Sequence, residues 1–263
     1  MADDDSIHIE FLGTGTSLGV PMIGCKCPVC KSDDPKDNRM RTSLLLRYRN
    51  KNIVIDCGPD FRTQLLRAGV DDLESVIITH EHRDHIAGLD DVRSINYILK
   101  KRVELRMSKE SLKAVELEFP YIFNPGEYQG APQIDVVELT PKPFDLLGLS
   151  FIPLEVMHRN MKVFGFRIGH FSYITDANFI PESTMELLKG TQILVLNALR
   201  PKRHPSHFSL DEAVEKAKEI GAEKTYFTHL GHLIGLHKKV NALLPRGMEL
   251  AYDGLKFSMN LLN

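Results

Sequence analysis

The chain has 263 residues, and its hydrophobic fraction of 43% and charged fraction of 26% are ordinary for a globular protein that buries one substantial core. A net charge of −2 argues against stable nucleic-acid binding through a broad basic surface, although a small nucleotide needs only local charge. No apolar run reaches membrane-spanning length, and the acidic start at residues 1–6 lacks the apolar core of a signal peptide. We therefore expect a cytoplasmic protein with no membrane partner, folded as one domain over residues 1–263.

Strand-like runs and helical patterns interleave along the chain, which predicts a mixed α/β protein. The expected strands are 7–12, 43–47, 52–56, 75–79, 151–157, 163–168, 171–175, 192–197 and 224–228. The expected helices are 60–68, 86–99, 109–119, 181–188 and 210–220. Ser209 and Glu212 form a capping box for the last helix, and Gly221 ends it.

The first distinctive segment is a Gly-rich turn after the first strand, followed by a group of three cysteines. The turn, Gly13-Thr-Gly-Thr-Ser17, permits close approach of the backbone to another element. Cys25, Cys27 and Cys30 lie within six residues, too close for an easy disulfide between the first two. Three thiolates with one more donor make a closed tetrahedral zinc site, and His232 is the candidate fourth ligand. The alternative is a set of reduced surface thiols, and the charged segment 31–41 is expected to be a solvated loop.

The run Thr79-His-Glu-His-Arg-Asp-His85 places three imidazoles and a carboxylate between a strand and a helical pattern. His80 and His82 are two residues apart and face one way in an extended turn, while Asp84 and His85 open the helix and face a second position. One turn can therefore serve two adjacent metal ions.

Further candidate ligands follow strand-like runs downstream. His158, Asp176 and His229 each come directly after such a run, where a rigid backbone can hold a coordination sphere. Asp56 ends the third strand, and Cys57 beside it is expected to be a small buried residue.

The motif HxHxDH is the signature of metallo-β-lactamase-fold hydrolases, and the downstream residues match the remaining motifs in order. The cysteine trio with Thr228-His-Leu-Gly-His232 resembles the phosphoribosyl 1,2-cyclic phosphate phosphodiesterase (PhnP-like) family, over residues 9–256. The resemblance implies a four-layer αββα sandwich and two active-site metals, zinc, manganese or iron. It also implies that Asp56 braces the ligand loop through hydrogen bonds. It implies that one metal is held by His80, His82 and His158, the other by Asp84, His85 and His229, with Asp176 bridging, and that Cys25, Cys27, Cys30 and His232 bind a structural zinc.

The same resemblance assigns catalytic roles. His207, just before the helix at 210–220, corresponds to the residue that contacts the scissile phosphate and assists the leaving oxygen, and Asp84 is counted as catalytic as well as a ligand. His204 is expected to be a bystander.

These residues predict a phosphodiesterase in which a hydroxide shared by two metals attacks a small cyclic or linear ribosyl or nucleotide phosphodiester. A homodimer is a family-level expectation. The alternatives are a ribonuclease Z-like nuclease, a thiolester hydrolase or β-lactamase, and a non-catalytic zinc-dependent binding module.

Overall fold

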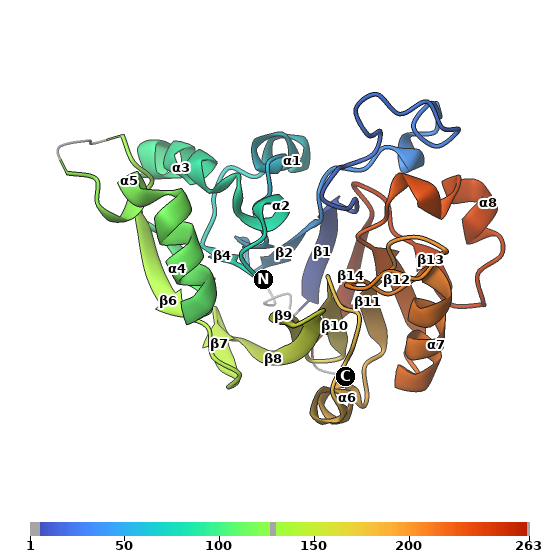
Figure 1. Cartoon of the computed structure of the whole chain (residues 1–263). Coiled ribbons are helices and arrows are strands. Elements are labelled where there is room, and N and C mark those ends of the chain that lie inside the picture. Colours follow the sequence, from blue (N-terminus) through green and yellow to red (C-terminus); the bar gives the residue numbers. More distant parts are fainter. Residues whose placement is uncertain (1–5, 127–129, 262–263) are drawn as a thin grey trace. The chain divides into compact units, whose positions relative to one another are not determined.

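A computed structural model describes residues 6–126 and 130–261, which form two compact units. Unit 1 takes its residues from 1–12, 43–140 and 256–263, and unit 2 from 13–42 and 141–255. Each unit is built on one seven-stranded mixed sheet (Figure 1). The prediction of one domain over residues 1–263 stays a prediction.

The sheet of unit 1 joins antiparallel pairs at one edge to parallel strands at the other. Its strands are, in spatial order, β14 (Lys256–Asn260), β1 (Ser6–Gly13), β2 (Ser43–Tyr48), β3 (Lys51–Ile55), β4 (Ser75–Ile77), β5 (Val103–Met107) and β6 (Ile134–Glu138). Strands β3 to β6 run parallel, so the segments that follow β3 and β4 emerge at one edge of the sheet.

The helices of unit 1 bury apolar faces against this sheet. They are α1 (Phe61–Ala68), α2 (Arg83–Ile86), α3 (Val92–Leu99), α4 (Lys109–Glu118) and α5 (Pro120–Phe123). The core contains Phe61 from α1, Val92 from α3 and Val115 from α4, packed with Val76 and Leu105 of the strands.

The sheet of unit 2 has the same construction. Its strands are, in spatial order, β13 (Met248–Leu250), β12 (Lys224–Thr228), β11 (Ile193–Asn197), β10 (Phe171–Ile174), β9 (Met161–Ile168), β8 (Leu149–His158) and β7 (Phe144–Leu146). Strands β10 to β13 are parallel and β7 to β10 antiparallel. The carboxyl ends of β10, β11 and β12 therefore meet at one edge.

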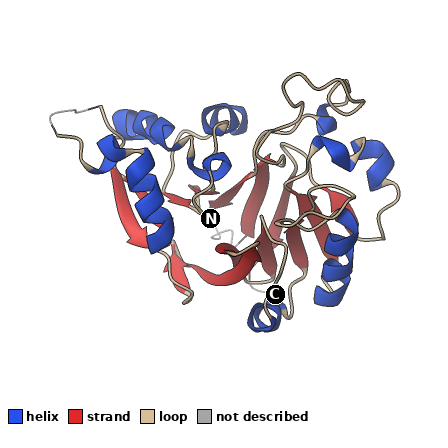
Figure 2. Ribbon diagram, in the orientation of Figure 1, coloured by secondary structure: helices blue, strands red, loops and turns tan. Residues whose placement is uncertain are grey.

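Unit 2 contains helices α6 (Glu182–Leu188), α7 (Leu210–Ile220) and α8 (His237–Asn241). Figure 2 draws the helices in blue, in the orientation of Figure 1. Ala213 and Ala217 of α7 pack on Leu194 and Leu196 of β11. The capping box of Ser209 and Glu212 is present, and Gly221 ends α7 in the left-handed conformation, so both sequence signals for this helix are confirmed.

Two sequence predictions of local structure need correction. The helix expected over 86–99 is broken into α2, a 3-10 turn at Leu89–Asp91 and α3. The segment 31–41 contains a 3-10 turn at Pro35–Asp37, and its Asp37 and Arg39 are buried rather than solvated. Arg39 is held there by hydrogen bonds to the Thr14 hydroxyl and the Ala251 carbonyl.

Candidate functional site

In unit 1, Asp56 organises the motif residues from the end of β3. Its carboxylate accepts hydrogen bonds from the backbone N–H and hydroxyl of Thr79, at 2.8 and 2.9 Å, and lies 2.7 Å from Nδ1 of His85. Burial raises the pKa of Asp56, while His85 and Thr79 oppose this by favouring the ionised carboxylate. The predicted bracing role of Asp56 is confirmed, and Cys57 is fully buried as expected.

The four motif residues lie close together on the turn after β4 and in α2. The ring of His80 is buried, with its centroid 4.6 Å from that of His82 and 4.2 Å from that of His85. His82 is exposed and stands just before α2, which contains Asp84 and His85 as predicted. Nε2 of His85 lies 3.3 Å from an Asp84 carboxylate oxygen, so two atoms that can each bind a metal ion face one another.

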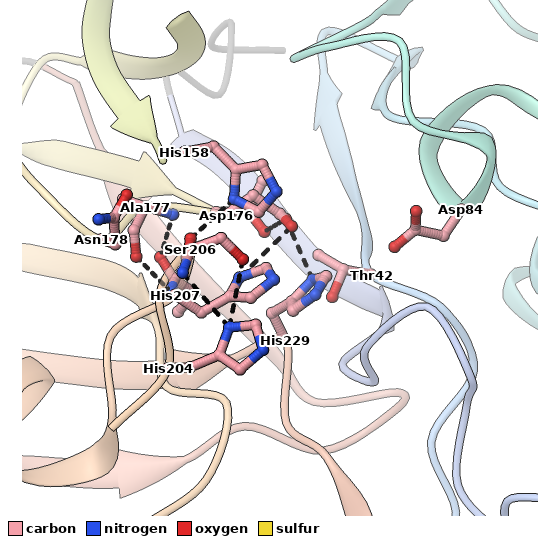
Figure 3. Close-up of polar contacts among 12 residues, drawn as sticks. Thr42, Asp84, His158, Asp176, Ala177, Asn178, His204, Ser206, His207 and His229 are labelled. Atoms are coloured by element: carbon pink, nitrogen blue, oxygen red, sulfur yellow. Dashed lines mark hydrogen bonds and ion pairs between the residues drawn. The ribbon is translucent and has the colours of Figure 1, made fainter. Parts of the chain in front are cut away.

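In unit 2, further residues gather around Asp176 at the carboxyl edge of the parallel strands (Figure 3). Oδ2 of Asp176 lies 3.1 Å from Nδ1 of His229, and Oδ1 lies 3.6 Å from Nδ1 of His207. The His207 ring centroid is 4.6 Å from that of His158 and 4.8 Å from that of His229. One donor atom each of His158, Asp176 and His207 lies within 4.8 Å of the others.

The sequence reasoning did not identify Asn197, which fixes the segment after Asp176. Its side chain makes a two-way contact with Ala177, accepting from the backbone N–H at 2.7 Å and donating to the carbonyl at 2.9 Å. Asn197 is the last residue of the buried strand β11, and a polar side chain at that position is the signal that marks it. The hydroxyl of Thr175 adds a hydrogen bond of 2.6 Å to Asp176 itself.

The electrostatics of His207 reflect its burial among other imidazoles. Burial, followed by the nearby His229, lowers the pKa of His207 to about 3, with Asp176 acting in the opposite direction. The ring is therefore neutral near pH 7 and keeps one N–H as a hydrogen-bond donor.

The cysteine trio and His232 form a separate cluster within unit 2. Nδ1 of His232 lies 3.2 Å from the Cys25 sulfur and 3.4 Å from that of Cys27, and one donor atom from each of these residues and Cys30 lies within 4.8 Å of the others. A hydrogen bond from the Cys30 backbone N–H is the main reason why the pKa of Cys27 falls to about 6, whereas burial raises the pKa of Cys30 to about 11.

Both donor sets fit metal ions by their chemistry. In a tetrahedral zinc site, sulfur and nitrogen ligands stand about 3.6 Å apart, close to the spacing in the cysteine cluster. Among the histidines, Nδ1 of His85 is taken up by Asp56, and Nδ1 of His158 lies 2.8 Å from the Ser206 carbonyl. Such contacts fix the tautomer, so that Nε2 is the ring atom that would bind a metal ion.

Each unit thus brings together its own share of the predicted residues. Unit 1 holds His80, His82, Asp84 and His85. Unit 2 holds His158, Asp176, His207 and His229, together with the cluster of three cysteines and His232. Their roles as ligands stay predictions. His204, expected to be a bystander, is half-buried with its ring centroid 5.3 Å from that of His207.

A family model described as a beta-lactamase superfamily domain matches residues 51–230. A crystal structure of a new diphosphatase from the PhnP family is 41% identical to the chain, covers 97% of both chains and has a TM-score of 0.91. The chain belongs to the PhnP family of the beta-lactamase superfamily. The predicted family and the α/β metallo-β-lactamase fold class are confirmed. The protein is thus a member of a hydrolase family.

Two curated relatives are also similar to this PhnP-family chain. An octanoyltransferase of Porphyromonas gingivalis is 39% identical over 249 residues, which are 94% of this chain but 50% of that protein. The chain therefore spans about half the length of that relative. A ribonuclease Z of Methanopyrus kandleri is 26% identical over 263 residues, covering 86% of this chain and 88% of the relative.

Within residues 6–126 and 130–261, no helix combines the length and apolar character that crossing a membrane requires.

Proposed function

We propose that this PhnP-family hydrolase is a dinuclear metal-dependent phosphodiesterase that acts on a small cyclic or linear phosphodiester. The observation that carries the proposal is the position of His207. His207 lies beside Asp176 and His158 at the strand edge but comes from the loop before α7. The candidate metal ligands therefore have next to them an additional imidazole that can donate a hydrogen bond. A phosphoester bond needs such a donor at its leaving oxygen, in addition to metal ligands.

The metal ions are proposed to be held by the seven strand-end and motif residues, His80, His82, Asp84, His85, His158, Asp176 and His229. When bound, two divalent cations would supply an activated water and would offset the negative charge that develops on phosphate. Asp56 keeps His85 oriented, and Asn197 keeps the backbone beside Asp176 in place. His207, neutral and buried, donates its N–H to the phosphate or the leaving oxygen.

A second candidate is hydrolysis of a diphosphate, because the relative that is 41% identical over 97% of the chain is a diphosphatase. The two reactions use the same metal ligands and differ only in the leaving group, which is an alcohol in one case and a phosphate in the other. A ribonuclease Z-like activity remains an alternative, supported by a relative of lower identity.

A substrate screen tests the proposal. Protein loaded with manganese or zinc is assayed with cyclic ribose phosphates, linear diesters, a diphosphate and a precursor transfer RNA, with a thiolester and a β-lactam as controls. Elemental analysis should give two active-site ions and one additional zinc per chain. Turnover of the thiolester or β-lactam alone would contradict the proposal, as would a metal-replete protein whose Asp176→Ala variant keeps all its metal and activity.

A further inference from the structure

His229 is turned toward Asp176 by a left-handed backbone just after the end of β12. Its φ is 55°, and its Nδ1 lies 3.1 Å from Oδ2 of Asp176 (Figure 3). A residue with a side chain rarely adopts this conformation, so the contacts of the neighbouring residues have to hold it there. On one side lies the buried residue Thr228 of β12, whose carbonyl accepts from the Ala198 N–H at 2.9 Å. The direction of the His229 ring therefore also depends on the contacts on the other side.

The residue on the other side, Leu230, is bound to the turn that follows β1. Its backbone N–H donates to the Thr14 carbonyl at 2.8 Å, and its carbonyl accepts from the Thr16 N–H at 3.2 Å. The next residue, Gly231, donates its N–H to the Leu199 carbonyl at 2.9 Å. All of these residues belong to unit 2. The path of the chain after His229 is therefore set by the positions of Thr14 and Thr16.

The side chain of Thr14 is itself held between two charged groups. Its fully buried hydroxyl accepts from Nη1 of Arg39 at 2.8 Å and donates to Oδ1 of Asp253 at 2.7 Å. Oδ2 of Asp253 accepts from the Met40 N–H at 2.7 Å, and Nη1 of Arg39 also donates to the Ala251 carbonyl at 2.6 Å. Hydrogen bonds to charged partners are stronger than those between neutral groups. Because the hydroxyl donates to one partner and accepts from the other, its orientation is fixed.

The guanidinium of Arg39 stays charged although it is almost fully buried. Burial lowers the pKa of Arg39 to about 10, while Asp253, Asp37 and Asp34 act in the opposite direction. The group is therefore a cation at neutral pH, and a buried cation that loses its partners is strongly unfavourable. Arg39 and Asp253 thus hold the Thr14 hydroxyl firmly, and the backbone of Thr14 passes this constraint to Leu230.

We propose that Thr14 is a positioning residue for His229, which acts through the backbone of Leu230 and is held in place by Arg39 and Asp253. The inference rests on the proposed metal-dependent function, since it concerns the direction of one candidate ligand. It adds to that function a residue that touches neither the substrate nor a metal ion. If the hydroxyl of Thr14 is lost, its charged partners rearrange, the turn shifts, and His229 is no longer aligned with the other candidate ligands.

The test compares two substitutions of Thr14 with a control elsewhere in unit 2. Thr14→Val replaces the hydroxyl by a methyl group and leaves Arg39 and Asp253 without that partner, whereas Thr14→Ser keeps the hydroxyl. The matched control is Thr184→Val. The Thr184 hydroxyl is also buried and donates to the Glu155 carbonyl at 2.6 Å, so this variant loses a buried hydrogen bond that has no part in the His229 turn.

Affinity for manganese is measured on protein that retains zinc in its cysteine cluster, because thiolates favour zinc over manganese. Thr14→Val should weaken manganese binding at the active site by about 10- to 100-fold, the usual effect of losing a residue that orients a ligand. At saturating manganese its kcat should fall, with KM for a phosphodiester changed by less than about 3-fold. Thr14→Ser and Thr184→Val should behave like the wild type in both measurements, although Thr184→Val lowers Tm.

Nuclear magnetic resonance of the histidine rings tests the position of His229 without any reaction. The ring resonances of His229, recognised by their absence in His229→Gln, are compared in protein without added metal and in protein loaded with zinc. Thr14→Val should shift them, and Thr14→Ser should restore the wild-type values. Asp253→Asn, whose amide oxygen can replace only one of the two carboxylate oxygens that accept hydrogen bonds, serves as a second variant with the same expected shift.

Two outcomes would overturn the inference. One is that the His229 resonances are unchanged in Thr14→Val and Asp253→Asn, whatever happens to the affinity for manganese. The other is that Thr184→Val changes the resonances and the manganese affinity as much as Thr14→Val, because the effect would then be a general loss of stability. If the wild type hydrolyses no phosphodiester, the proposed function fails, and the resonances of the protein without added metal still decide whether Thr14 positions His229.

Discussion

Three residues of the candidate site have a backbone conformation that L-amino acids rarely adopt. Asp56, Asp176 and His229 have φ values of 66°, 53° and 55°, and each stands just after a strand of its sheet. Such a conformation costs about 1–3 kcal/mol and persists where surrounding contacts determine it. Two such contacts are the hydrogen bond from Thr79 to Asp56 and the hydrogen bond between Asn197 and Ala177, the residue after Asp176. The directions of the Asp56 and Asp176 side chains therefore depend on hydrogen bonds that the periodicity of the strands does not reveal.

At the same scale, replacing His207 tests whether this residue donates a hydrogen bond to the leaving oxygen or binds a metal ion. His207→Ala should lower turnover of a diester with a poor leaving group by roughly 10²- to 10⁴-fold, the usual effect of losing a donor at the leaving oxygen. Metal content should not change. Because the donor atoms of His207, His158 and Asp176 lie within 4.8 Å of each other, loss of one metal equivalent in the variant would make His207 a ligand instead.

Among the elements, the strand ends that carry the candidate ligands were predictable from the sequence, and the connections between them were not. β12 begins and ends at the predicted residues, and β10 ends one residue before the prediction. β5 and β6 were not predicted, because Val103–Met107 and Ile134–Glu138 are short and mix charged with apolar residues. The helix after the motif was predicted as continuous since its apolar spacing continues through Gly88, where the chain turns instead.

At Gly88 the backbone lies so close to residues 57–61 that there is no room for a side chain, and this gives a test. A Cβ on this residue would lie 2.2 Å from the Gly58 carbonyl oxygen and 2.5 Å from Cβ of Phe61. Gly88→Ala should therefore destabilise the protein by about 2–3 kcal/mol or more, measured by urea unfolding. It should also disturb His85. The Gly88 backbone N–H donates to the Cys57 carbonyl, and the Cys57 N–H donates to the His85 carbonyl, so a shift at Gly88 reaches His85 through Cys57.

The matched control for that variant is Gly221→Ala. Gly221 has a φ of 76°, but a Cβ added there would have no atom within 4 Å, so only the backbone strain of about 1–2 kcal/mol applies. A Gly88 variant that is no less stable than the Gly221 variant would contradict the steric explanation.

For the whole molecule, the cysteine cluster is expected to contribute stability through a bound zinc. Cys25, Cys27 and Cys30 lie in the segment 13–42, and the backbone of Gly15 and Thr16 in that segment pairs with Leu230, next to His229. Cys27→Ser should release one zinc per chain and lower Tm. Cys57→Ala, at a buried cysteine outside the cluster, should retain all the zinc. Zinc content that is unchanged in Cys27→Ser would exclude the assignment.

His237 is expected to make the stability of the molecule depend on pH. It is buried at the start of α8, where Nδ1 lies 3.2 Å from Nη2 of Arg39, a group that only donates, so the ring must be neutral. Burial, then Arg39 and Lys36, lowers the pKa of His237 to about 4, while Asp34 and Asp37 act in the opposite direction.

Because the folded pKa lies below the unfolded value near 6.5, the unfolded chain takes up the proton first as the pH falls. The contribution to stability is therefore complete above pH 6.5 and is lost progressively between pH 6.5 and 4, by roughly 1–3 kcal/mol. His237→Gln keeps an acceptor for Arg39 without a titrating ring, so its Tm should fall less than that of the wild type over this range. His8→Gln, at an exposed position on β1, should follow the wild-type curve. Parallel Tm curves for wild type and His237→Gln would show that His237 does not titrate differently in the folded and unfolded states.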